Sequence, residues 1–216
     1  MPTGEPDETP TTQRRQARRK AETRQRILGT AQRLFAERGY SETSIEDIAA
    51  TADVAIRTIY LHFPSKAAIM LAYFDGWLDA FVDAVQRRPV DEPVADSVRF
   101  ALSAMAEAGW ADRTADEIHL AYPFLDQMTS GALDIAGHVL QRWLVAMDAL
   151  AATTAARTDV PAGSLVPSAR ASAVFAAWLA NMAVVQATRH GMQLPEGATG
   201  NSTGLEILGL ITGGEL

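Results

Sequence analysis

The sequence contains no cysteine among its 216 residues. This absence excludes disulfide frameworks, thiolate metal sites and cysteine nucleophiles, and it suits a reducing compartment. The N-terminal region also lacks the uninterrupted apolar segment of a secretory signal, because it carries charged residues and prolines instead. We therefore expect a cytoplasmic protein.

Several other patterns are missing. The apolar stretch 171–188 is interrupted by Asn181 and Gln186, which favours a helix buried in protein over a membrane span. No segment shows sustained alternation of apolar and polar residues, and no internal repeat is present. The sequence therefore predicts an all-α protein of about nine helices that does not partner with a membrane.

Catalytic signatures are absent as well. There is no G-x-S-x-G, phosphate-binding loop or H-E-x-x-H motif. An enzymatic or metal site built from Asp116, Glu117 and His119 is an alternative, but these three positions do not share one helix face. We expect a protein that is not an enzyme and has no cofactor or metal.

Charge is divided unevenly along a chain whose net charge is −7. Residues 1–10 hold three acids and no bases, residues 11–66 hold 11 Lys and Arg against 6 Asp and Glu, and residues 67–216 hold 8 against 17. A basic segment joined to an acidic body can bind phosphates at one end while the rest avoids nucleic acid. A solvated basic helix face would give the same count.

The pattern predicts three regions. Residues 1–20 are expected to form a disordered arm that is first acidic and then basic. Residues 21–66 are expected to form one small helical domain, and residues 67–216 a larger helical domain. The bases of the arm could lie along a DNA backbone or in a minor groove, or simply be solvated; they are Arg14, Arg15, Arg18, Arg19 and Lys20.

The second region has the spacing of three short helices. The first starts at Glu22 and stops at Gly39. The second starts at a capping box, either Thr43 with Glu46 or Ser44 with Asp47, and the third runs from about Ala55 to Phe63, ahead of Pro64. Their predicted core is Ile45, Ile48, Ala49, Val54, Ile59 and Phe63.

Later helices follow the breakers in the sequence. They are expected at Lys66–Arg88, Val94–Ala111, Ala115–Met128, Leu133–Thr154, Ser168–Arg189 and Leu205–Ile211.

The segment GYSETSIEDIAATADVAIRTIYLHFPSK, residues 39–66, places a short helix, a tight turn and a second short helix in the order of a helix-turn-helix. It resembles the signature of the TetR family of regulators, with its D-I-A, A-x-V and T-I-Y-x-H-F-x-S-K elements. The resemblance covers about the first 70 residues. It implies a DNA-binding regulator, most often a repressor.

Residue chemistry places one group of side chains nearer the surface of the third helix, namely Ile56, Arg57, Thr58, Leu61 and His62. Arg57 and Lys66 each lie in the first turn of a helix, where a cation opposes the helix dipole unless a phosphate is bound. His62 has no acid or nucleophile at helical spacing, so it is not predicted to be a general base.

The resemblance assigns roles to these positions. It implies that Arg57 reads base edges. It also implies that a second group binds phosphates: Thr43, Thr58, Tyr60, His62 and Lys66. Ser44, Ala55, Ile56 and Leu61 complete the expected DNA-binding set, although the ring of Tyr60 could instead pack under the helix. Ala55 replaces the usual capping serine and Ile56-Arg57 replaces a commoner pair, so the operator sequence cannot be taken from relatives.

The third region is rich in aromatic residues and methionine. The resemblance implies a pocket for a small apolar or aromatic molecule, although each of these residues could be plain core. The expected ligand-binding residues are Trp77, Phe100, Met105, Trp110, His119, Tyr122, Trp143, Met147 and Asn181.

The helix at Ser168–Arg189 is apolar on nearly every side and needs a second partner. In the family the last two long helices pair with their copies, so we expect a homodimer. Its interface would use Phe175, Trp178, Leu179, Met182 and the C-terminal helix with Leu205, Leu208 and Ile211. The leading hypothesis is a ligand-released repressor on a near-palindromic operator. The alternative is a dimeric DNA-binding protein with no effector.

Overall fold

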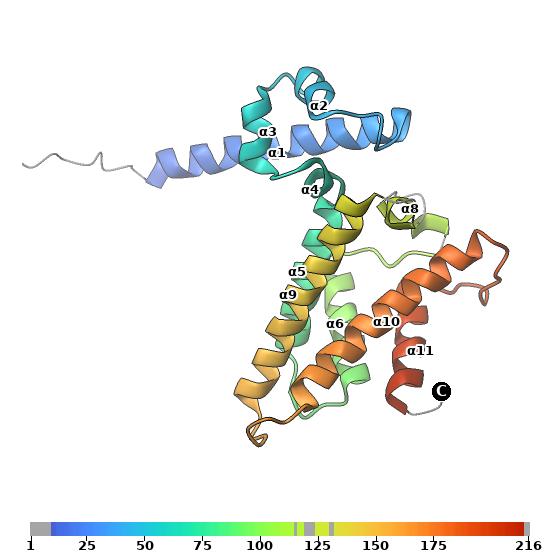
Figure 1. Ribbon diagram of the computed structural model, residues 1–216. Helices are drawn as coiled ribbons and strands as arrows, with labels where there is room; N and C mark the ends of the chain where they lie inside the picture. The colour runs from blue at the N-terminus through green and yellow to red at the C-terminus, as the bar shows by residue number, and fades with distance from the viewer. Residues whose placement is uncertain (1–9, 115, 119–123, 130–131, 214–216) are drawn as a thin grey trace, which may run out of the picture. The chain divides into compact units, whose positions relative to one another are not determined.

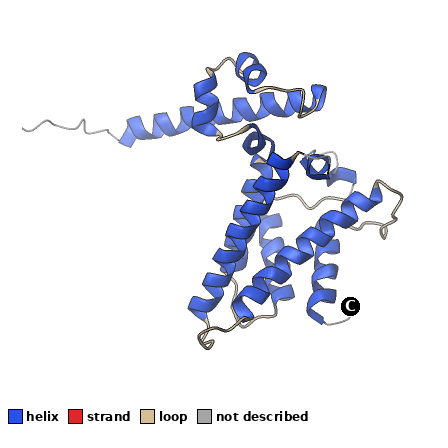
Figure 2. Cartoon of the chain, viewed as in Figure 1, coloured by secondary structure: helices blue, strands red, loops and turns tan. Residues whose placement is uncertain are grey.

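The computed structural model describes residues 10–114, 116–118, 124–129 and 132–213. Within these ranges every regular element is a helix (Figure 2). This confirms the all-α prediction. The chain divides into two compact units, residues 1–72 and residues 73–216.

The first unit contains four helices, α1 (Pro10–Arg38), α2 (Ile45–Thr51), α3 (Ile56–His62) and α4 (Lys66–Met70). Figure 1 shows α2 and α3 lying against α1. Five of the six predicted core side chains are buried, and Val54 is half-buried. Gly39 has a φ of +87° and follows the last residue of α1, as its position in the sequence predicts.

The first helix is longer than expected. The prediction of a disordered arm through residue 20 is wrong for residues 10–20, because α1 begins at Pro10. Proline is favoured in the first turn of a helix, and the Arg, Gln, Ala and Lys residues that follow are good helix formers. The basic residues expected on a flexible arm therefore project from a helix.

The second unit contains six named helices, α5 (Ala72–Gln86), α6 (Val94–Glu107), α8 (Phe124–Thr129), α9 (Leu133–Arg157), α10 (Val166–Thr188) and α11 (Gly200–Gly213). Helix α10 packs against both α9 and α11 (Figure 1). By length and by its hydropathy of 1.4 this helix could cross a membrane, a test that core helices also pass.

Two helix predictions are corrected. The predicted helix Lys66–Arg88 is interrupted at Leu71, which has a φ of −92° and a ψ of 3°. Its neighbours are good helix formers and Leu71 is completely buried, so tertiary packing rather than local propensity sets the break. Helix α6 stops at Glu107 instead of Ala111, because Gly109, with a φ of +92°, takes the left-handed conformation that ends helices.

Candidate DNA interface and ligand cavity

Helix α2 begins with a complete capping box. The Ser44 hydroxyl accepts a hydrogen bond from the Asp47 amide at 3.0 Å, and the Asp47 carboxylate accepts one from the Ser44 amide at 2.9 Å. Hydrogen bonds from the Ser44 hydroxyl and amide lower the pKa of Asp47. Of the two boxes that the sequence allows, this is the one that forms, and it occupies the Ser44 hydroxyl.

Thr43 and Lys66 hold the loop between α1 and α2. Thr43 is 1% exposed, and its hydroxyl donates to the Gly39 carbonyl at 2.8 Å and the Leu34 carbonyl at 3.3 Å. The Lys66 ammonium donates to the carbonyls of Tyr40 and Thr43, at 2.9 and 3.2 Å. It also lies 4.1 Å from the centre of the Tyr40 ring.

Thr43 and Lys66 therefore make structural contacts, and the phosphate-binding roles expected for them stay predictions. In this structure the Thr43 hydroxyl is inside the protein, and the Lys66 ammonium is directed at two backbone carbonyls. The sequence does not reveal that Lys66 holds this loop, because its partners, the carbonyls of Thr43 and Tyr40, are 23 and 26 residues away along the chain.

The outer face of α3 is open. Ile59 alone is buried in this helix, whereas Tyr60 is 54% and Leu61 69% exposed. The alternative in which the Tyr60 ring packs under the helix is therefore excluded. Arg57 and Ile56 are also exposed, and Thr58 is half-buried. Ala55 precedes the helix without a side-chain cap, and within the first turn the Thr58 amide donates to the Ala55 carbonyl at 2.8 Å.

His62 closes α3 and contacts α1. Its carbonyl accepts a hydrogen bond from the Arg24 guanidinium at 2.9 Å, and that guanidinium lies 4.1 Å from the centre of the Phe63 ring. Burial, and then the charges of Lys20 and Arg24, lower the pKa of His62. A neutral imidazole keeps one N–H that can donate to a phosphate.

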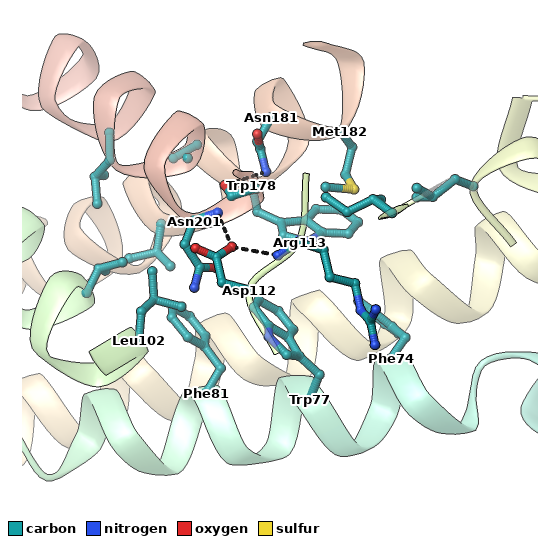
Figure 3. A pocket seen from close by; sticks show the side chains of 18 of the residues that line it. Phe74, Trp77, Phe81, Leu102, Asp112, Arg113, Trp178, Asn181, Met182 and Asn201 are labelled. Carbon is teal, nitrogen blue, oxygen red and sulfur yellow. Dashed lines mark hydrogen bonds between the residues drawn. The ribbon is translucent and has the colours of Figure 1, made fainter. Parts of the chain in front are cut away.

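The second unit contains a cavity of about 140 Å³ that is partly open to solvent. Aromatic rings dominate its wall. Trp77 stacks on Phe81 with ring centres 5.1 Å apart, and Trp178 lies 5.1 Å from Trp143 and 5.8 Å from Phe74. The side chains come from α5, α6, α8, α9, α10 and α11 and from the segment after α6 (Figure 3). Such a wall suits a small apolar or aromatic molecule.

Three of the predicted ligand-binding residues, Trp77, Trp143 and Asn181, line this cavity. Phe100 does not, because it faces outward at 47% exposure, with the Arg88 guanidinium 4.5 Å from its ring centre. Trp110 packs edge-on against Tyr73 at 5.3 Å. Neither Met105 nor Met147 is among the described lining residues. His119 and Tyr122 lie outside the described residues.

The predicted dimer residues divide between two environments. Trp178 and Met182 line the cavity, and Phe175 packs on Trp143 at 5.4 Å between ring centres. Leu179 is 48% exposed, whereas Leu208 of the C-terminal helix is 1% exposed and lines the cavity. Leu208 is therefore a cavity residue in this chain rather than a free surface residue.

Sequence reasoning missed the polar contacts that fix α11 against the cavity. The Asp112 carboxylate accepts hydrogen bonds from the Asn201 amide at 3.1 Å and the Thr199 hydroxyl at 2.6 Å. It also accepts one from the Arg113 amide at 2.9 Å. The Asn181 side chain donates to the Gly200 carbonyl at 3.1 Å (Figure 3). Asn201 in α11 and Thr199 just before it lie 89 and 87 residues from Asp112, so no local signal reveals these partners.

The described residues contain no cluster of three or more metal-binding side chains. Glu117, once considered for a catalytic cluster, accepts hydrogen bonds from the amide and hydroxyl of Thr114, which lower the pKa of its carboxyl. Its role is to cap a helical turn.

Comparison with known sequences identifies relatives of both units. Residues 27–73 match the family profile described as bacterial regulatory proteins, tetR family. The transcriptional regulator EthR of Mycolicibacterium smegmatis is 28% identical over 162 residues, which are 72% of this chain and 70% of EthR. TcmR of Streptomyces glaucescens is 30% identical over 114 residues, 51% of this chain and half the length of TcmR.

Solved structures show the same fold over most of the chain. The TetR-family repressor FadR of Thermus thermophilus, solved with lauroyl-CoA, aligns with a TM-score of 0.55 and 20% identity. That alignment covers 89% of this chain and 95% of FadR. GusR of Salmonella enterica aligns with a TM-score of 0.51 and 20% identity over 89% of this chain and 94% of GusR. These relatives are regulators rather than enzymes, and residues 27–73 carry the DNA-binding domain of the TetR family of helix-turn-helix transcriptional regulators.

Proposed function

We propose that this protein is a repressor that binds a near-palindromic operator as a homodimer and is released by a small apolar or aromatic ligand. The observation that carries the DNA-binding part is the outer face of α3, on which Arg57, Tyr60 and Leu61 are all exposed. In a major groove, Arg57 reads guanine, while Tyr60 and Thr58 contact phosphates and fix the register. The protein acts in the cytoplasm.

Homodimer formation is supported by an apolar surface on the two long helices. Leu140 and Leu144 of α9 are 50% and 49% exposed, and Leu179 of α10 is 48% exposed. These side chains exceed what one core face needs, and a second copy of the chain would cover them. Two recognition helices in such a dimer reach half-sites about 34 to 36 Å apart.

Ligand sensing is supported by the aromatic cavity. Dry cavities of roughly 150 Å³ accept a benzene-sized molecule, and this cavity, at about 140 Å³, has that size. An apolar cavity that side chains leave unfilled supports ligand sensing over the effector-independent alternative.

The experiment is selection of bound fragments from a genomic DNA pool, followed by footprinting on the recovered sites. We expect protection of two related half-sites. Arg57→Ala should weaken operator binding by about 1–3 kcal/mol and relax specificity at one base pair. The matched control is Arg33→Ala, an exposed arginine of α1 that pairs with Glu37. Recovery of no specific fragment by the wild-type protein would refute the proposal.

A further inference from the structure

One arginine lies in the wall of the ligand cavity. Asp112 and Arg113 are the charged residues among its described lining. The Asp112 carboxylate is occupied by two amides and one hydroxyl, and it lies at the positive N-terminal end of α11. The Arg113 side chain leaves the same wall and extends toward Phe74 (Figure 3). The cavity is therefore aromatic, with one guanidinium in its wall.

We propose that the ligand is an aromatic organic anion whose carboxylate binds Arg113 and whose ring lies between Trp77 and Trp178. This rests on the proposed ligand sensing. A guanidinium carries five N–H donors in a fork that matches a carboxylate, so Arg113 can bind a ligand beside the protein groups with which it already interacts, which include the nearby Glu117 carboxyl. The same cation disfavours an amine of equal size, even though aromatic rings alone would attract one.

The test uses three ligands of one shape and different charge: 3-phenylpropanoate, 3-phenylpropanamide and 3-phenylpropylamine. Binding is measured with the full chain by quenching of tryptophan fluorescence, since Trp77, Trp143 and Trp178 line the cavity. We expect the carboxylate to bind at least about tenfold more tightly than the amide, as a charge-assisted hydrogen bond would give. The amine should bind most weakly.

Arg113→Met should remove the preference for the carboxylate while leaving the amide affinity unchanged, and Arg113→Lys should retain part of it. Equal binding of carboxylate and amide, or a preference that survives in Arg113→Met, overturns the anion assignment alone. Failure of all three ligands to bind at millimolar concentration overturns the assignment together with the proposed sensing. Operator binding, measured separately, is not affected by either result.

The N-terminal part of α1 carries a second, independent inference. All ten residues from Gln13 to Glu22 are exposed, and Ile27 is the first buried residue of the described helix. The segment carries one acid, Glu22, which pairs with Arg18 at 3.4 Å. We call these residues the basic extension, and its cations are Arg14, Arg15, Arg18, Arg19 and Lys20.

The basic extension emerges beside the end of the recognition helix. Arg24, one turn further along α1, bonds to the His62 carbonyl, and the charge of Lys20 reaches the His62 imidazole. Arg14 lies ten residues before Arg24, which is about 15 Å of helix. Since each strand carries one phosphate per about 3.4 Å of duplex axis, an extension of this length can reach more than one phosphate beside a groove that holds α3.

We infer that the basic extension is a second phosphate-binding element beside each recognition helix; this rests on the proposed DNA binding. Cations spaced four residues apart, such as Arg14 with Arg18 and Arg15 with Arg19, repel one another along a helix that packs on nothing. Phosphates relieve that repulsion. The extension adds affinity for any duplex, because backbone contacts carry no sequence information.

The test is the salt dependence of DNA binding, on a duplex recovered from the genomic selection and on a random duplex of equal length. The variant changes Arg14, Arg15, Arg18 and Arg19 to Gln, which preserves helix propensity. Each lost phosphate contact lowers the slope of log affinity against log salt by about 0.9. If one side of the helix lies on DNA, two of the four arginines contact phosphates. We then expect the slope of log affinity against log salt to fall by about 1.8 per protomer on both duplexes.

The control changes Arg33, Arg38, Arg87 and Arg99 to Gln, four exposed arginines that lie outside the basic extension. It has the same net charge as the variant and should keep the wild-type slope. A wild-type slope in the Arg14 to Arg19 variant, or equal losses in variant and control, overturns this inference. A wild-type protein that prefers no duplex refutes the proposed function instead, and the slope on the random duplex still decides the role of the extension.

Discussion

Thr43→Val is the sharpest test of the first unit, because it separates a structural hydroxyl from a DNA-binding one. Valine has the shape of threonine but lacks the hydroxyl. Thr43 is 1% exposed, and its hydroxyl donates to the carbonyls of Gly39 and Leu34. Leaving a buried acceptor without its donor costs about 1–3 kcal/mol. With a urea dependence of about 2 kcal/mol per molar, the unfolding midpoint should fall by about 0.5–1.5 M.

Two spectroscopic signals identify which unit is affected. All four tryptophans, Trp77, Trp110, Trp143 and Trp178, belong to the second unit, so their fluorescence follows that unit alone. Far-ultraviolet circular dichroism follows the helices of both units. We expect Thr43→Val to move part of the dichroism transition to lower urea and to leave the fluorescence transition in place.

The matched control is Thr58→Val, at a half-buried position of α3. It should leave both unfolding transitions unchanged and weaken operator binding. If Thr43→Val instead left the dichroism transition unchanged and weakened DNA binding as Thr58→Val does, the structural role derived for Thr43 would be wrong.

Three further substitutions have defined outcomes. Lys66→Met removes two hydrogen bonds to the loop after α1. It should lower the stability of the first unit by about 1–2 kcal/mol, measured by the same dichroism transition. Unchanged stability would contradict the role of Lys66 in holding this loop. Gly209→Ala should stabilise α11 by up to about 1 kcal/mol, because a methyl group there meets no atom within 4 Å, and slower amide exchange in α11 would show it. The pKa of His62 is lowered below its usual 6.5 on folding, so its contribution to stability is present above pH 6.5 and is lost as the pH falls from there through the lower pKa of the folded state. His62→Gln should flatten the change in stability between about pH 7 and 5, and an unaltered pH profile would refute this cause.

Features set by neighbouring residues were predictable from the sequence. The core positions of α2 and α3 follow helical spacing, and the Ser44 capping box and the Gly39 stop depend on residues within one turn. The family signature identifies the recognition helix because these local features occur together.

Features set by distant contacts were not predictable. Thr43 and Lys66 have the residue types of phosphate ligands, and only the fold shows that they point at carbonyls of the preceding loop. The residue type of Phe100 predicts a place in the cavity wall, but its position on α6 directs the side chain outward. Asp112 and Arg113 lie in a segment without helical periodicity, so their place in the cavity wall depends on α11, almost ninety residues later.

The attachment of α11 to Asp112 also bears on when the sensor becomes competent during synthesis. The cavity wall begins at Tyr73 and is completed by Leu208 of α11. Because α11 is the last helix of the described residues, it is synthesised after every other helix of that wall. The helix-turn-helix, complete by residue 70, can fold far earlier. Under the proposed function, the element that contacts DNA is therefore folded before the cavity that senses a ligand is closed.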